Sequence, residues 1–99
     1  MLNLAPTKLL YSVPVGEDNA VTAAELCARF DMTERELRQA FEALRKSGEV
    51  ICSCDHGFFK PETKTELEKY ISRESKRARS VFFSLKSARK LLKEWENTK

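Results

Sequence analysis

Cys52, Cys54 and His56 are spaced two residues apart, and all three side chains are potential metal ligands. On a β-strand, alternate residues share one face, so this pattern raises the question of a zinc site. Three ligands on one short strand, with no fourth at the usual spacing, make a poor tetrahedral site. We therefore interpret them as small strand residues with a loop histidine, and Cys27 as a small core residue. The sequence predicts no metal and no cofactor.

The remaining residues contain no pattern that is typical of a catalytic site. The chain holds a single histidine, no glycine-rich phosphate loop and no recognisable set of nucleophile, base and orienting residue. Its three cysteines are odd in number and include no C-x-x-C pair, which favours reduced thiols over a disulfide framework. We predict that the protein is not an enzyme.

Length and composition indicate a small folded protein. The 99 residues are 41% hydrophobic and 33% charged, which suits a compact domain with an appendage. The first residues lack the apolar run of a secretory signal, and no stretch approaches the roughly 20 apolar residues of a membrane span. We predict a cytoplasmic protein without a membrane partner.

Positive charge is concentrated in the second half of the chain. Residues 1–60 carry seven Lys or Arg against nine Asp or Glu, whereas residues 61–99 carry eleven against six. Between Lys69 and Lys93 only one acid, Glu74, stands among nine bases: Lys69, Arg73, Lys76, Arg77, Arg79, Lys86, Arg89, Lys90 and Lys93. These bases either form a stripe that contacts phosphates or simply keep a helix face soluble. A polyanion is expected to meet this tail first.

Two helices with matching start signals precede the tail. Thr22 with Glu25, and Thr33 with Glu36, form the S/T-x-x-E pattern of a capping box. They predict helices over 22–30 and 33–47, the second ended by Gly48, with a short turn between them. A short helix over 6–12, a loop over 13–19 and a one-rung strand at 20–21 come before. Such a helix pair is a helix-turn-helix unit.

A hairpin and one core should complete this head. Residues 50–53 and 57–60 are rich in strand formers and are separated by a short polar stretch, which predicts a β-hairpin wing. The inner faces of the helices and the wing predict one buried cluster of seven residues: Leu26, Phe30, Leu37, Phe41, Leu44, Val50 and Phe58. The predicted fold class is therefore mostly α with a small β-hairpin wing, a winged helix-turn-helix head over residues 1–61.

Residues 62–99 are predicted to form one long basic amphipathic helix, because they contain neither Gly nor Pro and begin with Thr63 or Thr65 as a cap. Apolar residues repeat at steps of 3 and 4, with one interruption at Glu74: Leu67, Ile71, Ala78, Val81, Leu85, Ala88, Leu92 and Trp95. This seam is longer than the head can cover, so the sequence predicts a homodimer through the C-terminal helix. The prediction leaves open whether that helix is continuous or broken at 72–80.

The segment TAAELCARFDMTERELRQAFEALRKSGEVICSCDHGFFK and the following PETKTELEKYISRESKRARS carry a family resemblance. The chain resembles winged helix-turn-helix DNA-binding proteins, in particular small bacterial prophage-encoded members, over about 60 to 80 residues. The resemblance implies double-stranded DNA as the partner, with the recognition helix, about 33–47, in the major groove. The usual contact positions of the family fall on Thr33, Glu34, Arg35, Arg38, Gln39 and Arg45, and the basic residues Arg73, Lys76, Arg77 and Arg79 are expected to aid.

Two functions from different classes remain open at this point. The first is a phage-type regulator of transcription or replication, favoured by the suitability of Arg38 and Gln39 for bidentate contacts with base edges. The second is an adaptor or assembly protein whose winged head binds another protein, favoured by the net charge of −2 on residues 1–60. The fold alone cannot choose between them.

Overall fold

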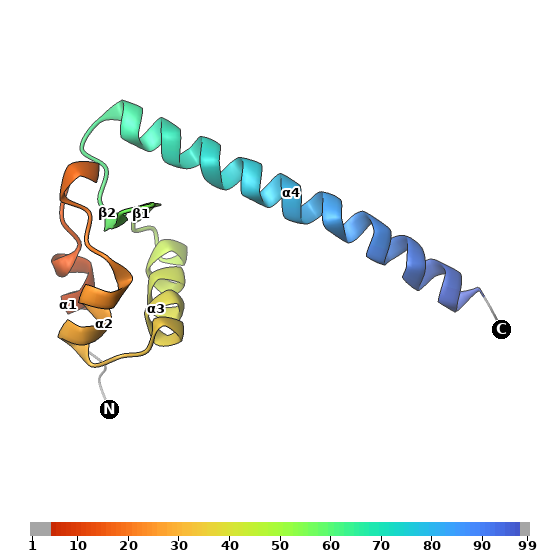
Figure 1. Cartoon of the computed structure of the whole chain (residues 1–99), viewed down its shortest axis with the longest axis horizontal. Helices are drawn as coiled ribbons and strands as arrows, with labels where there is room; N and C mark the ends of the chain where they lie inside the picture. Colours follow the sequence, from red (N-terminus) through yellow and green to blue (C-terminus); the bar gives the residue numbers. More distant parts are fainter. Residues whose placement is uncertain (1–4, 98–99) are drawn as a thin grey trace.

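The computed structural model describes residues 5–97 and shows a helical head from which one long helix projects (Figure 1). In chain order the elements are α1 (Ala5–Ser12), a 3₁₀ turn η1 (Glu17–Asn19), α2 (Ala23–Phe30), α3 (Glu34–Lys46), β1 (Cys52–Cys54), β2 (Gly57–Phe59) and α4 (Lys64–Glu96). The predicted fold class is confirmed: helices, a two-stranded wing and a long C-terminal helix. Residues 1–4 and 98–99, the ends of the two predicted segments, lie outside the described residues.

Both helices of the helix-turn-helix unit begin with the predicted capping boxes. The Thr22 hydroxyl accepts a hydrogen bond from the Glu25 amide, and the Thr33 hydroxyl accepts one from the Glu36 amide, each at 3.1 Å. In both boxes the glutamate carboxylate accepts from the backbone amide of its threonine in return. Orphan amides at each helix start are thereby satisfied, which fixes where α2 and α3 begin.

The wing is an antiparallel hairpin that also holds the segment before α2. Cys52 pairs with Phe59, and Cys54 pairs with Gly57. The predicted one-rung strand forms as an isolated bridge between Val21 and Phe58. Gly57 has φ +126°, and a Cβ atom there would lie 1.9 Å from the carbonyl oxygen of Val21. Only glycine fits where these two backbones meet.

The core of the head differs from the prediction at three places. Leu26, Leu37 and Phe41 are buried as predicted, and the other predicted members Phe30, Leu44 and Phe58 pack against them. The predicted burial of Val50 is wrong, because its side chain is 49% exposed and Ile51 occupies the core instead. These two residues lie between Gly48 and β1, outside any regular element, and the backbone there directs Ile51 inward and Val50 outward. Four further buried residues were not predicted: Leu9 and Val13 of the N-terminal segment, Cys52 of β1 and Phe59 of β2.

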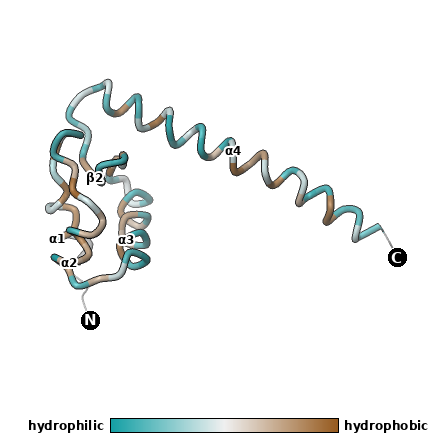
Figure 2. The backbone as a smooth tube through the Cα atoms, in the orientation of Figure 1, coloured by the Kyte–Doolittle hydropathy of each residue, from teal (hydrophilic) through white to brown (hydrophobic). Residues whose placement is uncertain are grey.

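Helix α4 is continuous over 33 residues, and only its first turns lie against the head. Thr63, one of the two predicted caps, accepts a hydrogen bond from the Glu66 amide at 3.2 Å. Leu67, Tyr70 and Glu74 are half-buried beside the hairpin, whereas residues 76–97 are exposed throughout. Apolar and polar positions alternate along this projecting part (Figure 2). We call residues 76–97 the overhang.

Within residues 5–97, none of the helices combines the length and the apolar character that crossing a bilayer requires.

Candidate nucleic-acid interface

Helix α3 presents a polar face to solvent on the side away from the core. Arg35, Arg38 and Gln39 are all exposed, while Leu37 between them is buried. The helical period explains this arrangement, because the residues on either side of a buried position turn outward. Three of the residues predicted to contact DNA therefore stand on an accessible face.

Thr33 is also exposed, but it has a structural task as the N-cap of α3. A hydroxyl oxygen that accepts from the helix can still donate its own proton to a phosphate. Glu34, which fell on a contact position of the family, is exposed in the same first turn and would repel a phosphate there. Further along, Glu42 forms an ion pair with Lys46 at 3.0 Å, so part of the charge on the outer face of α3 is internally compensated.

Arg45 occupies a different place from the other predicted contact residues. Its Nε donates to the carbonyl oxygen of Ile51 at 2.9 Å, and its guanidinium carbon lies 6.0 Å from the ring centre of Phe41 and 5.9 Å from that of Tyr70. One terminal nitrogen of its guanidinium group is fully buried without a hydrogen-bond partner. Arg45 thus joins α3, the approach to β1 and α4, and its guanidinium group does not lie on the outer face of α3 with Arg35 and Arg38.

The pKa values of two neighbours reflect the same enclosed environment. Burial raises the pKa of the Tyr70 hydroxyl, and the positive charge of Arg45 only partly opposes this effect. Burial likewise raises the pKa of the Cys52 thiol, which lies inside the hairpin. The inner side of the junction, around Cys52 and the Tyr70 hydroxyl, is therefore partly desolvated.

The predicted basic residues at the start of α4 divide into two groups. Arg73 is exposed and its guanidinium donates to the carbonyl oxygen of Ser53, which fastens α4 to β1. Lys76 and Arg79 are exposed on the overhang and project away from the helix face that continues from the head contact. Only the second group is available for phosphate contacts without giving up a bond to the head.

Arg77 lines a cleft between α3 and α4. The cleft has a volume of about 510 Å³ and lies between α3, the hairpin and α4. Its lining residues are Arg38, Glu42, Arg45, Ser53, Phe58, Glu74 and Arg77. Arg38 of α3 and Arg77 of α4 therefore share one cleft, although 39 positions separate them in the sequence.

Glu66 links α4 to the N-terminal half of the head, a role that was not predicted from the sequence. Its carboxylate accepts from the backbone amides of Glu62 at 2.9 Å and Glu17 at 3.1 Å. These hydrogen bonds lower the pKa of the Glu66 carboxyl below its ordinary value. The S/T-x-x-E pattern formed with Thr63 was a signal for the local part of this network, but the contact with Glu17 depends on the tertiary fold.

Cys54, His56 and Arg73 lie beside a small recess at the tip of the hairpin, together with Glu17 and Asp55. His56 falls in the turn after β1, so it does not continue the alternation of Cys52 and Cys54 along a strand. Within residues 5–97 no group of three or more His, Cys, Asp or Glu side chains is placed to hold a metal ion. Cys27 packs at the edge of the core, as the sequence predicted.

No protein-family model, curated protein or solved structure matches this chain with significance.

Proposed function

We propose that this chain is a cytoplasmic DNA-binding protein that regulates transcription or replication, of the kind found in phages and prophages. The proposal is carried by one observation: the second helix of a helix-turn-helix unit exposes Arg35, Arg38 and Gln39 beside a β-hairpin wing. Arginine and glutamine are the side chains that make bidentate contacts with guanine and adenine edges in the major groove. Helix α3 is therefore the reading element of the proposal.

The basic side of α4 supplies the affinity that α3 lacks. Helix α3 carries three acids among its four bases, so its own attraction for phosphates is small. The overhang carries seven bases against two acids, and Arg77 shares a cleft with Arg38 of the recognition helix. If α3 reads a duplex, the lysine and arginine side chains of α4 lie close to the DNA backbone. Contacts of α3 with the nucleobases then give sequence specificity, and contacts of α4 with the phosphates give affinity.

An adaptor function is the second candidate, and it rests on a different observation. The overhang exposes several large apolar side chains, which is the usual sign of a protein-binding surface. The acidic balance of residues 1–60 also suits a protein partner better than a polyanion. In this case the head would bind a protein, and α3 would have no role in reading bases.

Fluorescence anisotropy with a labelled random duplex separates the two candidates. We expect binding that weakens steeply between about 50 and 200 mM salt, because lysine and arginine displace counterions from phosphates. Lys76→Ala should weaken binding and reduce the salt slope by about one unit. Lys8→Ala removes the same charge from the exposed side of α1 and serves as the matched control, with no change expected.

Base reading is tested with a duplex selected from a random pool by the full-length chain. Arg38→Ala should weaken binding to the selected duplex by about 1–3 kcal/mol and leave random duplex nearly unaffected. Equal losses on both duplexes would contradict base readout at Arg38. Absence of any binding to random duplex at micromolar protein and low salt would exclude DNA and favour the adaptor.

A further inference from the structure

The overhang carries an apolar stripe whose large side chains are exposed to solvent. Its residues recur at steps of 3 and 4 on the same side of α4 that packs against the hairpin further back: Ala78, Val81, Leu85, Ala88, Leu92 and Trp95. The large members are between 43% and 66% exposed, and Phe82 and Leu91 on its borders are exposed to a similar degree. We call these six residues the overhang stripe. Such a surface on a helix that projects from its domain points to a partner helix.

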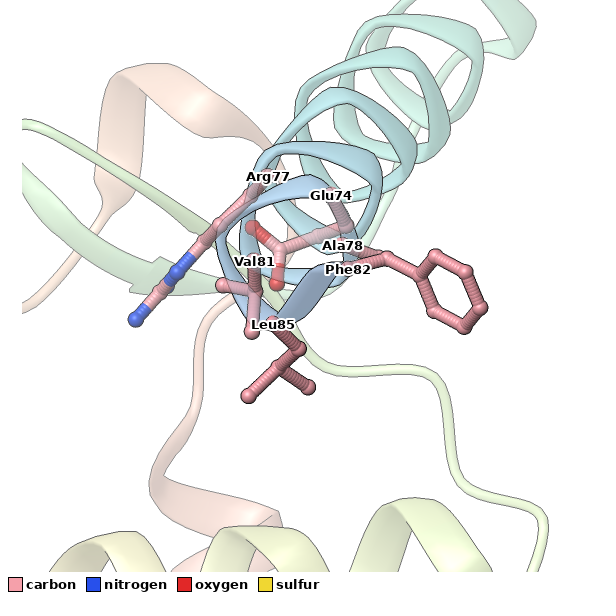
Figure 3. Close-up of a pocket in the computed structure, with 6 residues that line it drawn as sticks. All are labelled: Glu74, Arg77, Ala78, Val81, Phe82 and Leu85. Carbon is pink, nitrogen blue, oxygen red and sulfur yellow. The ribbon is translucent and has the colours of Figure 1, made fainter. Parts of the chain in front are cut away.

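A hollow lies on this stripe at the position of its first small residue. It has a volume of about 380 Å³ and is lined by Glu74, Arg77, Ala78, Val81, Phe82 and Leu85. Figure 3 shows Val81 and Leu85 projecting to the same side of α4, with Arg77 and Phe82 flanking them. Because Ala78 has only a methyl group, the floor of the hollow can receive a large side chain from another helix.

The order of residue sizes along the stripe identifies that other helix. Pairing the stripe with its own copy in antiparallel orientation, about a point between residues 86 and 87, matches each residue with one of complementary size. Ala78 meets Trp95 of the partner subunit, and Val81 meets Leu92 of the partner subunit. Leu85 meets Ala88 of the partner subunit. Each pair of facing residues forms one layer, and the two-fold axis generates three further, equivalent layers. Every layer then combines a larger with a smaller side chain, or two of medium size.

Parallel pairing of the same stripe would give layers with very different total side-chain volumes. Each residue would meet its own copy, so two layers would hold only a pair of alanines and one would hold two tryptophans. Alanine pairs leave voids, and a pair of indoles on one layer forces the helices apart. The sequence of sizes is therefore suited to the antiparallel arrangement only.

We propose that a second copy of this chain docks its α4 antiparallel on the overhang stripe, with Trp95 of the partner subunit seated in the hollow over Ala78. The exposed apolar side chains offer on the order of 500 Å² per chain, so a symmetric pair buries on the order of 1,000 Å², which is the lower limit for a specific interface. This interface does not rest on the proposed DNA function, because it is argued from the apolar stripe, on the opposite side of α4 from Lys76 and Arg79. Arg77 is the one proposed DNA residue that borders the hollow.

Charge gives the interface a second recognisable property. Each overhang carries a net charge of +5, from seven lysines and arginines and two glutamates over residues 76–97. Pairing brings these like charges together, and salt screens their repulsion. The dimer should therefore tighten as salt rises, whereas binding to DNA should weaken. One titration in salt thus separates the two associations by the sign of the effect.

Sedimentation equilibrium and the fluorescence of Trp95, the only tryptophan of the chain, test dimerisation on the full-length protein. We expect a dimer at tens of micromolar protein in high salt, and a blue shift of the emission as the chain concentration rises. Leu85→Asp should raise the dimer dissociation constant by more than about 100-fold, because each copy loses a central contact and gains a charge. Phe83→Asp on the opposite side of α4 is the matched control and should leave the dimer intact. A monomeric wild-type chain in high salt would overturn the proposal, as would equal effects of the two substitutions.

Disulfide trapping tests the orientation. A chain with Val81→Cys is mixed with a size-tagged chain carrying Leu92→Cys, and the oxidised products are separated by size. The antiparallel register predicts the mixed disulfide in excess over the wild-type background from the native thiols. Two copies of position 81 would then stand 11 residues apart along the axis, or about 16 Å, too far for a disulfide. A dominant homodisulfide of the Val81→Cys chain would show parallel pairing and overturn the register.

Discussion

The head and the overhang contain similar apolar side chains but bury them differently. In the head, α1, α2, α3 and the hairpin enclose Leu26, Leu37 and Phe41 almost completely. In the overhang, Leu85, Leu92 and Trp95 repeat with the same helical spacing and remain exposed. An amphipathic pattern therefore indicates which face of a helix needs cover, but not which molecule supplies it. Helix α4 shows both outcomes, since its first turns are covered by its own head.

The largest expected contrast is between two phenylalanines. Phe41→Ala should cost about 3–5 kcal/mol and unfold so small a head, because it empties the centre of the core and removes the ring that contacts Phe58 at 4.5 Å. Phe83→Ala on the overhang should change stability by less than about 0.5 kcal/mol. Thermal denaturation followed by circular dichroism measures both. Similar melting temperatures for the two variants would contradict the division between a packed head and an uncovered overhang.

A smaller effect is expected at the junction of the two regions. Arg45→Ala should destabilise the chain by about 1–3 kcal/mol, because it leaves the carbonyl oxygen of Ile51 without its donor and removes the contacts with Phe41 and Tyr70. Lys46→Ala is the matched control, since its ion pair with Glu42 is exposed and should contribute less than about 1 kcal/mol. Urea denaturation compares the two. If the Arg45→Ala variant had native stability but bound DNA more weakly, Arg45 would be a DNA-contacting residue and not a structural one.

The smallest effect is a pH dependence at the start of α4. The pKa of Glu66 is lowered in the folded chain, so its contribution to stability is complete above its ordinary pKa and is lost as pH falls through the folded value. Protonation should weaken the bonds from the Glu17 and Glu62 amides. Nuclear magnetic resonance titration should therefore show the amide signals of both residues shifting together at a pH below the ordinary range for glutamate. Glu66→Gln should abolish this titration, and Glu68→Gln should leave it unchanged.

Local signals in the sequence were sufficient for most of the fold. The capping boxes at Thr22 and Thr33, the glycine after α3 and the absence of Gly or Pro beyond Glu62 each act within a few residues, and each marked an element boundary to within about two residues. A one-rung strand at 20–21 was also predicted, but its bridge partner Phe58 was not, because that pairing is a long-range contact. Elements whose ends are fixed by neighbouring backbone groups can be predicted from a single sequence.

Long-range contacts account for what could not be predicted. Whether Val50 or Ile51 turns inward depends on the backbone direction after Gly48, and periodicity does not determine that direction. Similarly, a helical wheel leaves Arg45 and Arg38 on one border of α3. Tyr70 and the Ile51 carbonyl draw only Arg45 into the interior. For the candidate site, Arg35, Arg38, Lys76, Arg77 and Arg79 are exposed, whereas Arg45 is not. The sequence could not show that Arg38 and Arg77 share a cleft.

The length of α4 beyond its junction has a mechanical consequence. From Glu74 to Glu96 the helix extends about 33 Å, and it is attached to the head only at its base. It therefore acts as a lever whose pivot is the contact of Arg45, Tyr70 and Arg73 with the head. A tilt of about 10° at that pivot displaces the tip by roughly 6 Å, which is more than one helical turn. A small rotation at the pivot therefore causes a large displacement of the C-terminal end of α4. A substitution at the pivot should change the position of that end more than the position of any other part of the helix.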